Sequence, residues 1–257
     1  MTIKRLILLF ILLATSISEA EDISNKNKIQ EIAKVYSASM QYIFKNQTLI
    51  NNQSRQKEAL FGSNFISNVK STYKQKFMTN TFPDENILAI KVLLEVMIEV
   101  MEDNRTLILD EDISFKGFIP AIFAFQISER YSKKGIGIIV KFTNEADRVR
   151  NKFNTPDPWE ADAIKNIKQN KLAEYYDENG LYKGAKSSRY MIPVAMSAMC
   201  LTCHGTPKEN PANFNIPRIE WTLLDKTGFP MENWKMSDFG GGISVTIYDA
   251  KTLGETY

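Results

Sequence analysis

The sequence has few of the side chains that commonly hold metals and cofactors. Its 257 residues include one histidine and two cysteines, and all three fall within the stretch MCLTCHG, residues 199–205. A structural zinc site needs four ligands, usually cysteines and histidines, so such a site is disfavoured. Two cysteines this close together also cannot cross-link a chain of this length, and its stability therefore has to come from packing.

The chain also lacks a marked excess of charge of one sign. Without residues 1–20 it has 30 basic and 29 acidic side chains, a net charge of +1. This balance gives no electrostatic reason to expect nucleic acid or an anionic lipid surface as a partner. The length is sufficient for one hydrophobic core with a helical extension.

Long hydrophobic runs are missing too. The most apolar later segment, residues 87–101, is interrupted by Lys91, Glu95 and Glu99 and cannot span a bilayer. Residues 1–20 have Lys and Arg near the start, a short apolar run and a small-residue ending, the pattern of a secretory signal peptide. The apolar run is about half of the ~20 residues that a membrane-spanning helix needs, so an uncleaved anchor is the alternative. We expect an exported, periplasmic protein without a membrane span once the signal peptide is cleaved.

The hydrophobic pattern predicts helices first and strands afterwards. We expect helices over residues 30–44, 84–103 and 117–133, and a fourth helix that follows a loop at residues 154–160 and ends near residue 169. We expect strands over residues 135–143, 172–180, 181–196 and 243–250. The motif then lies between the last two strands. This order predicts an α+β fold, with an antiparallel sheet, flanking helices and a long N-terminal helical region. We divide the chain into a signal peptide at residues 1–20, an N-terminal helical region at 21–84 and a motif-bearing domain at 85–257.

The spacing Cys200-x-x-Cys203-His204 is typical of covalent haem c attachment. Two thiols three positions apart on a helical turn can reach the two vinyl groups of a porphyrin, and the next residue can offer its imidazole to the iron. A thioredoxin-like dithiol is the main alternative, but that motif normally opens a helix after an early strand, whereas this one comes late in the chain. A zinc knuckle is a third interpretation, for which the chain offers no further cysteine or histidine.

A single histidine limits how such an iron can be coordinated. His204 would be the proximal ligand, and a second imidazole could not stand opposite it. The sixth position is then taken by Met, Lys, Tyr, a backbone group or water, or it is empty. We choose Met40, because a helix remote in sequence can cover the distal side, although a methionine taken alone is more often a flexible core side chain. The methionines beside the motif are Met191, Met196 and Met199.

Four blocks of sequence, in this order, resemble a known family. They are FKGFIPAIFAFQISERY, VRNKFNTPDPWEADAI, SSRYMIPVAMSAMCLTCHGTP and DFGGGISVTIY. The segment that contains them, with the apolar helix before it, is similar to the haem c domains with a PAS-like fold at the sensory end of bacterial histidine kinases and chemoreceptors. Some members of that family are free-standing exported proteins.

The resemblance implies a PAS-like antiparallel sheet with one covalent haem c, bound by Cys200, Cys203 and His204. It also implies that Arg150, Arg189 and Tyr190 lie in blocks where contacts to the haem propionates or the sheet edge are expected. Some relatives supply a distal cysteine from the N-terminal region, and this sequence has none there. Properties that depend on such a ligand are therefore not expected here. In the GGG run we expect close backbone approach or a bulge at residues 241–242.

Two functions fit these features. The first is a sensor in which a redox change or a small gas alters the distal side of the haem, read by a membrane-bound signalling protein. The second is a periplasmic electron carrier whose partner is another cytochrome. A second copy of the chain is also among the expected partners. Catalysis is the weakest possibility, because no distal histidine is available as an acid or base.

Overall fold

The first half of the chain forms a helical layer. The structure is a computed structural model that describes residues 25–249, so the predicted signal peptide lies outside the described residues. Residues 25–45 form a long helix, which confirms the helix predicted over residues 30–44. The helices that follow are α2 (Gln47–Asn51), α3 (Gly62–Lys76), α4 (Leu88–Asp103), α5 (Arg105–Leu109) and α6 (Pro120–Lys133).

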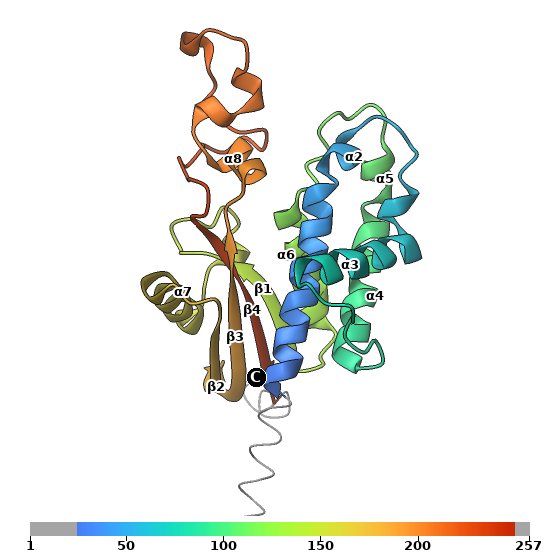
Figure 1. Cartoon of the computed structure of the whole chain (residues 1–257), viewed down its shortest axis with the longest axis vertical. Helices are drawn as coiled ribbons and strands as arrows, with labels where there is room; N and C mark the ends of the chain where they lie inside the picture. The colour runs from blue at the N-terminus through green and yellow to red at the C-terminus, as the bar shows by residue number, and fades with distance from the viewer. Residues whose placement is uncertain (1–24, 250–257) are drawn as a thin grey trace, which may run out of the picture.

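The second half builds a four-stranded antiparallel sheet. Its strands are β1 (Ile138–Thr143), β2 (Tyr175–Tyr182), β3 (Ala185–Ala195) and β4 (Phe239–Tyr248), in the order β1-β4-β3-β2. The helical layer covers one face of this sheet, and α7 (Pro158–Asn170) covers the other (Figure 1). Helices and a separate antiparallel sheet confirm the α+β class.

Buried side chains that alternate along the strands form two cores, one on each face of the sheet. Tyr190 in β3 and Val245 in β4 are buried in the main core, which they share with residues 25–45, α4 and α6. The next residue along β3, Met191, is buried in a smaller core with Ala163 and Ile164 of α7. Successive side chains of a strand point to opposite faces of the sheet, so β3 contributes to both cores, as expected for a strand that is buried on both faces.

The motif lies on a projection from one end of the sheet. Helix α8 (Ala198–His204) follows β3 directly. Residues 205–238 then form an excursion before β4, and it stands out from the sheet as a tower (Figure 1). Within residues 25–249 no helix is long and apolar enough to cross a bilayer. The short 3-10 helices are η1 (Glu58–Leu60), η2 (Lys152–Asn154), η3 (Pro207–Glu209), η4 (Pro211–Asn213) and η5 (Arg218–Glu220).

The glycine run at the start of β4 confirms the predicted close approach. A Cβ on Gly242 would lie 2.5 Å from Sδ of Met191, and one on Gly241 would lie 2.8 Å from the ring of Phe142. Gly241 also has φ +144, which L-residues rarely adopt. The pairing of β3 with β4 is irregular at the same place, between Val194 and Ala195. Only glycine fits this crossing of three strands.

We expect Gly241→Ala to lower the free energy of unfolding by about 3 kcal/mol, the upper end of what overpacking costs. Gly135→Ala is the matched control, since Gly135 has φ +67 but no atom within 4 Å of the place that a methyl group would occupy. The free energy of unfolding of the control should fall by less, because the only cost there is that of placing alanine at a positive φ. Urea denaturation followed by circular dichroism measures both. Equal losses in the two variants would contradict the steric argument.

Two buried lysines hold the part of the helical layer around α2 and α5 together. Lys57 is 1% exposed, and its Nζ donates to the carbonyl oxygens of Ile50, Asn52 and Ile108 at 3.0, 2.9 and 2.6 Å. Lys116 is 4% exposed and donates to backbone carbonyls of the loop that precedes it. Burial, together with the charge of Lys116, lowers the pKa of Lys57. Lys57 thus joins the ends of α2 and α5 through backbone oxygens.

Candidate functional site

Helix α8 holds the motif in a fixed orientation at the base of the tower. Its only buried side chain, Leu201, packs with Met196 and Trp234 in a small separate core. The helix ends at Gly205, whose N–H donates to the Leu201 carbonyl at 2.9 Å. A Cβ at position 205 would lie 2.6 Å from that same oxygen, so the close ending requires glycine. The backbone therefore turns away immediately after His204.

The three motif side chains share one face of α8, because helix residues three and four apart are neighbours. Both cysteines are half-buried free thiols. The Sγ atom of Cys200 lies 3.2 Å from the Ser197 hydroxyl. Burial raises the pKa of the Cys203 thiol. A redox-active dithiol normally has a lowered thiol pKa, so this environment does not favour the thioredoxin-like interpretation.

The imidazole of His204 is held by a carboxylate and an indole. Nδ1 lies 3.0 Å from Oε2 of Glu232, and the ring stacks on Trp234 with centroids 5.0 Å apart and an interplanar angle of 15°. An ionised carboxylate can only accept, so Nδ1 carries the proton in this contact. Nε2 of the neutral ring is then the nitrogen with a free lone pair, which is the form that binds metals.

Arg150 connects the motif to the excursion that follows it. Its Nε donates to Oε1 of Glu232 at 2.7 Å, and its Nη1 donates to Oδ2 of Asp225 at 2.5 Å. Burial would raise the pKa of both carboxyls, but hydrogen bonds to Arg150 outweigh it, with further donors from His204 to Glu232 and from Thr227 to Asp225. Both pKa values are therefore lowered, and both groups are ionised at neutral pH.

The sequence identified Arg150 but not its partners. Glu232, Asp225 and Trp234 come from the excursion, where no hydrophobic period or motif marks them. The resemblance implied contacts of Arg150 to haem propionates or to the sheet edge, and in the structure its guanidinium lies between two carboxylates of this chain. Proximity in sequence would not have identified the stacking partner either, because Trp221 is nearer to His204 than Trp234 is.

Arg189 and Tyr190 lie away from the motif. Arg189 is 2% exposed under α7, where it donates to Asp157 at 2.6 Å and stands 4.4 Å above the Trp159 ring. Tyr190 is buried on the opposite face, and its hydroxyl donates to Glu174 at 2.7 Å. Along β3, Arg189 is about 20 Å from Ala195 at ~3.3 Å per residue. This placement gives the predicted cofactor contacts of these two residues no support, because their polar atoms already have partners within the fold.

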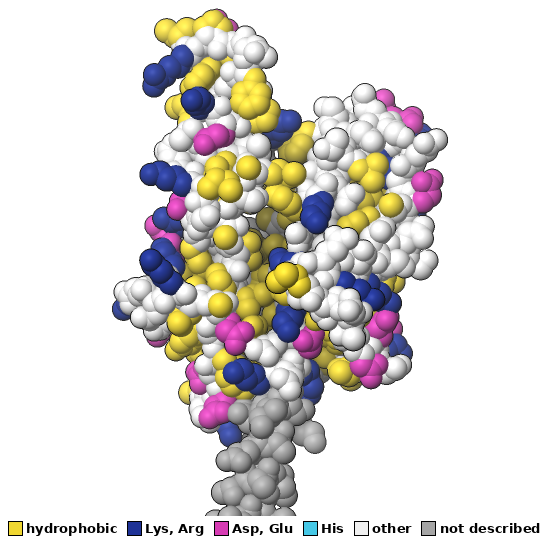
Figure 2. Space-filling view, viewed as in Figure 1, with side chains coloured by type: hydrophobic (Ala, Val, Ile, Leu, Met, Phe, Trp, Pro, Cys, Tyr) yellow, Lys and Arg dark blue, Asp and Glu magenta, His cyan; other side chains and the backbone are white. Residues whose placement is uncertain are grey.

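Met40 lies on the helix formed by residues 25–45 and is 8% exposed. At the end of the sheet nearest α8, Phe142, Ile192 and Val194 are only partly buried against the main core. Figure 2 shows a hollow between the tower and the helical layer, and hydrophobic side chains line it. A hydrophobic hollow in the same molecule as two half-buried thiols and an imidazole held through Nδ1 suits a flat, hydrophobic cofactor attached through sulfur.

Met40 itself belongs to the main core, and the three methionines beside the motif in sequence lie in other surroundings. Met191 is fully buried under α7, Met196 packs with Trp234 and Met199 is 43% exposed on α8 itself. Among residues 25–249 there is no group of three or more His, Cys, Asp or Glu side chains that could hold a metal ion alone.

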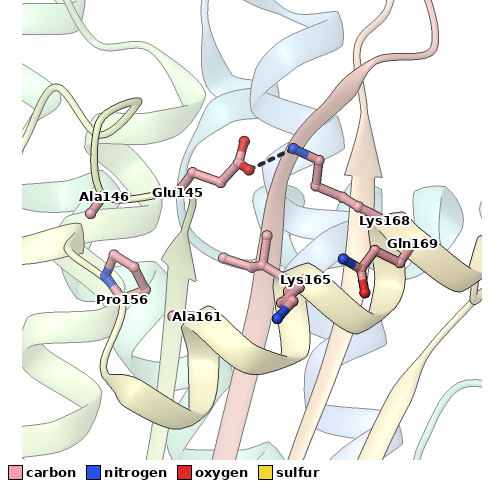
Figure 3. A pocket seen from close by; sticks show the side chains of 8 residues that line it. Glu145, Ala146, Pro156, Ala161, Lys165, Lys168 and Gln169 are labelled. Carbon is pink, nitrogen blue, oxygen red and sulfur yellow. Dashed lines mark hydrogen bonds and ion pairs between the residues drawn. The ribbon is translucent and has the colours of Figure 1, made fainter.

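A pocket elsewhere on the surface is separate from the motif. It has a volume of about 300 Å³ and lies beside α7. Its lining includes Lys165, Gln169 and the ion pair of Lys168 with Glu145, whose atoms are 2.5 Å apart (Figure 3). None of its residues belongs to the motif or to the Arg150 cluster, and no buried polar group points into it, so we do not regard it as the functional site.

Comparison with known proteins gives one family and one solved structure. A family model with the description "Tll0287-like: Tll0287" matches residues 14–247 of the chain. The chain is also similar to a solved structure, "Crystal structure of the cyanobacterial heme-protein Tll0287", with 19% sequence identity, coverage of 66% of this chain and 98% of that chain, and a TM-score of 0.37. No protein with a curated description matches the chain.

Proposed function

Since the chain belongs to the Tll0287-like family, we propose that it is an exported protein that binds one haem c covalently. Cys200 and Cys203 form the thioether bonds, and Nε2 of His204 is the proximal ligand. The observation that carries this proposal is the pairing of two free thiols with an imidazole whose Nδ1 is already bonded to Glu232. The solved protein to which the chain is similar is named as a heme-protein.

Attachment requires only groups that the motif supplies. Each thiol adds across one vinyl group, so that an S–C bond forms and the thiol hydrogen goes to the other vinyl carbon, with no net oxidation. When bound, the haem supplies an iron that can change its oxidation state and its sixth ligand.

Expression in a periplasm with haem c maturation proteins tests the proposal. The purified protein should keep one haem per chain after acid–acetone extraction, measured by the pyridine haemochrome spectrum and by intact mass. Cell fractionation should recover it in the periplasm. Complete extraction of the haem, or an oxidised dithiol in place of thioethers, would exclude it.

Met40 is the sixth ligand in this proposal. It lies on the helix opposite the tower and is nearly buried, so its thioether is shielded from water. We expect Met40→Leu to change a six-coordinate low-spin iron into a five-coordinate or water-bound one, because leucine has a similar volume but no donor atom. Optical and EPR spectra measure the change. Met97→Leu, in the same core and 0% exposed, is the control and should keep the low-spin spectrum.

The helix that carries Met40 favours sensing as the role of the haem. It runs along the helical layer to the end of the sheet that lies away from the tower (Figure 1), where Gln30 donates to Glu174, the acceptor of the Tyr190 hydroxyl. Release of Met40 on reduction or on gas binding would free this helix to shift. We expect reduced, CO-bound protein to exchange amide hydrogens faster over residues 30–44 than oxidised protein. Unchanged exchange together with no CO uptake would contradict the sensor role.

Electron transfer is the second candidate, and the thioether of Met40 favours it. A His/Met iron that stays six-coordinate in both oxidation states reorganises little and suits a carrier. Fast reduction by a partner cytochrome, with no binding of CO or NO, would select this role. A five-coordinate high-spin iron in both states would exclude it.

A further inference from the structure

We propose that Glu232, held in place by Arg150, is a positioning residue that fixes the orientation of His204 and lowers the reduction potential of the iron bound to it. This inference rests on the proposed function, since it concerns the iron that His204 would hold. It assigns a role to a carboxylate that the motif itself does not contain.

Both oxygens of Glu232 are engaged. Oε2 accepts from Nδ1 of His204 at 3.0 Å, while Oε1 accepts from Nε of Arg150 at 2.7 Å. The carboxylate therefore cannot rotate away from the imidazole without losing a charged partner. Trp234 fixes the remaining freedom of the ring by stacking on it at 15°. The plane of the imidazole and the direction of Nε2 are set before any cofactor binds.

Arg150 is itself tightly held. Its Nη1 donates to Asp225, whose side chain is 0% exposed, and its guanidinium lies 5.0 Å from the centre of the Phe229 ring. Nη2 lies 3.4 Å from the carbonyl oxygen of Cys203, within the motif. One arginine thus ties both the excursion and the end of α8 to the carboxylate that orients the histidine.

The expected effect on the iron follows from charge. Arg150, Asp225 and Glu232 together carry one positive and two negative charges, a net charge of −1 next to the proximal ligand. A carboxylate that accepts from Nδ1 makes the imidazole a stronger donor than a backbone carbonyl would. Both effects stabilise ferric over ferrous iron. Because the cluster is largely shielded from solvent, salt screens it only partly.

Glu232→Gln in the haem-loaded protein is the test. The amide keeps the shape but offers one acceptor to two donors, so it cannot satisfy His204 and Arg150 together. We expect the reduction equilibrium to shift at least tenfold toward ferrous iron, about 59 mV for one electron. We also expect a lower iron–histidine stretching frequency in resonance Raman spectra of the ferrous protein when both forms also carry Met40→Leu, in which the iron is five-coordinate. Glu232→Asp, which keeps the charge, should lie closer to the wild type in both measurements and applies equally if the Gln variant does not fold.

Glu220→Gln is the matched control. Glu220 is an exposed acid of the same excursion, outside the Arg150 cluster, and its loss removes the same charge from the surface. The potential of the control should stay at the wild-type value. Full haem content with an unchanged potential and Raman band in Glu232→Gln would overturn the inference alone. Absence of covalent haem in the wild type would instead overturn the proposed function.

Discussion

The double replacement of Cys200 and Cys203 by serine is expected to abolish covalent haem. Serine is nearly the same size as cysteine, but its hydroxyl does not add to a vinyl group under the conditions in which thiols do. Both sulfurs are half-buried on one face of α8, and the chain has no other cysteine that can substitute for them. Acid–acetone should extract all haem from the double variant and none from the wild type.

Single replacements of each cysteine, and a control substitution on the same helix, test whether the loss of haem is specific to the two thiols. Each single variant should retain haem through the remaining thioether, with the α-band shifted to longer wavelength because one vinyl group stays unsaturated. Met199→Ala is the control on the same helix, since its side chain is 43% exposed and offers no attachment chemistry. If the double variant kept its haem through denaturation, the attachment would have to involve other residues.

Replacing Lys57 by methionine is expected to cost about 2–4 kcal/mol of unfolding free energy, since it removes an ammonium that donates to three carbonyls, two of them in buried hydrogen bonds. Methionine matches the length of the lysine stem but cannot donate to Ile50, Asn52 and Ile108. Relief of the cost of burying an amine, which also lowers the pKa of Lys57, offsets part of the loss and keeps the estimate moderate.

Urea titration of the wild type and of Lys57→Met measures this loss as a shift of the midpoint. Lys165→Met is the control, because Lys165 is an exposed lysine of α7 at which the same chemical change removes no buried hydrogen bond. The control should unfold within about 0.5 kcal/mol of the wild type, as surface substitutions usually do. A similar midpoint for all three proteins would show that the lysine is dispensable to the α2–α5 junction.

The sequence was sufficient for most elements because their signals are local. The helix at residues 25–45 and the strands β1 and β4 follow directly from hydrophobic periods and bounding glycines. Helix α3 was not among the predicted helices, because asparagine, serine and lysine make up much of it. Its buried residues Phe65, Val69 and Tyr73 nevertheless repeat at a helical spacing of four. Polar composition concealed a period that was present.

The candidate site was predictable only as far as the motif extends. Cys200, Cys203 and His204 are neighbours in sequence, so their spacing alone indicates their chemistry. Glu232 and Asp225 reach the histidine and the arginine only after the excursion has folded back on α8, a contact that no local pattern encodes. Long-range ion pairs of this kind depend on tertiary structure, which is why Arg150 was associated with the site but with a different partner.

The order of strands in the sheet has a consequence for the timing of assembly. The central strand β4 is the last in the chain, and it lies between β1 and β3. The sheet therefore cannot close until residues 239–248 are available, and its pairings span long stretches of sequence, which slows folding. Until then residues 199–205 belong to an open chain. In the proposed function, this delay is the interval in which an attachment enzyme can reach both thiols before the tower encloses them.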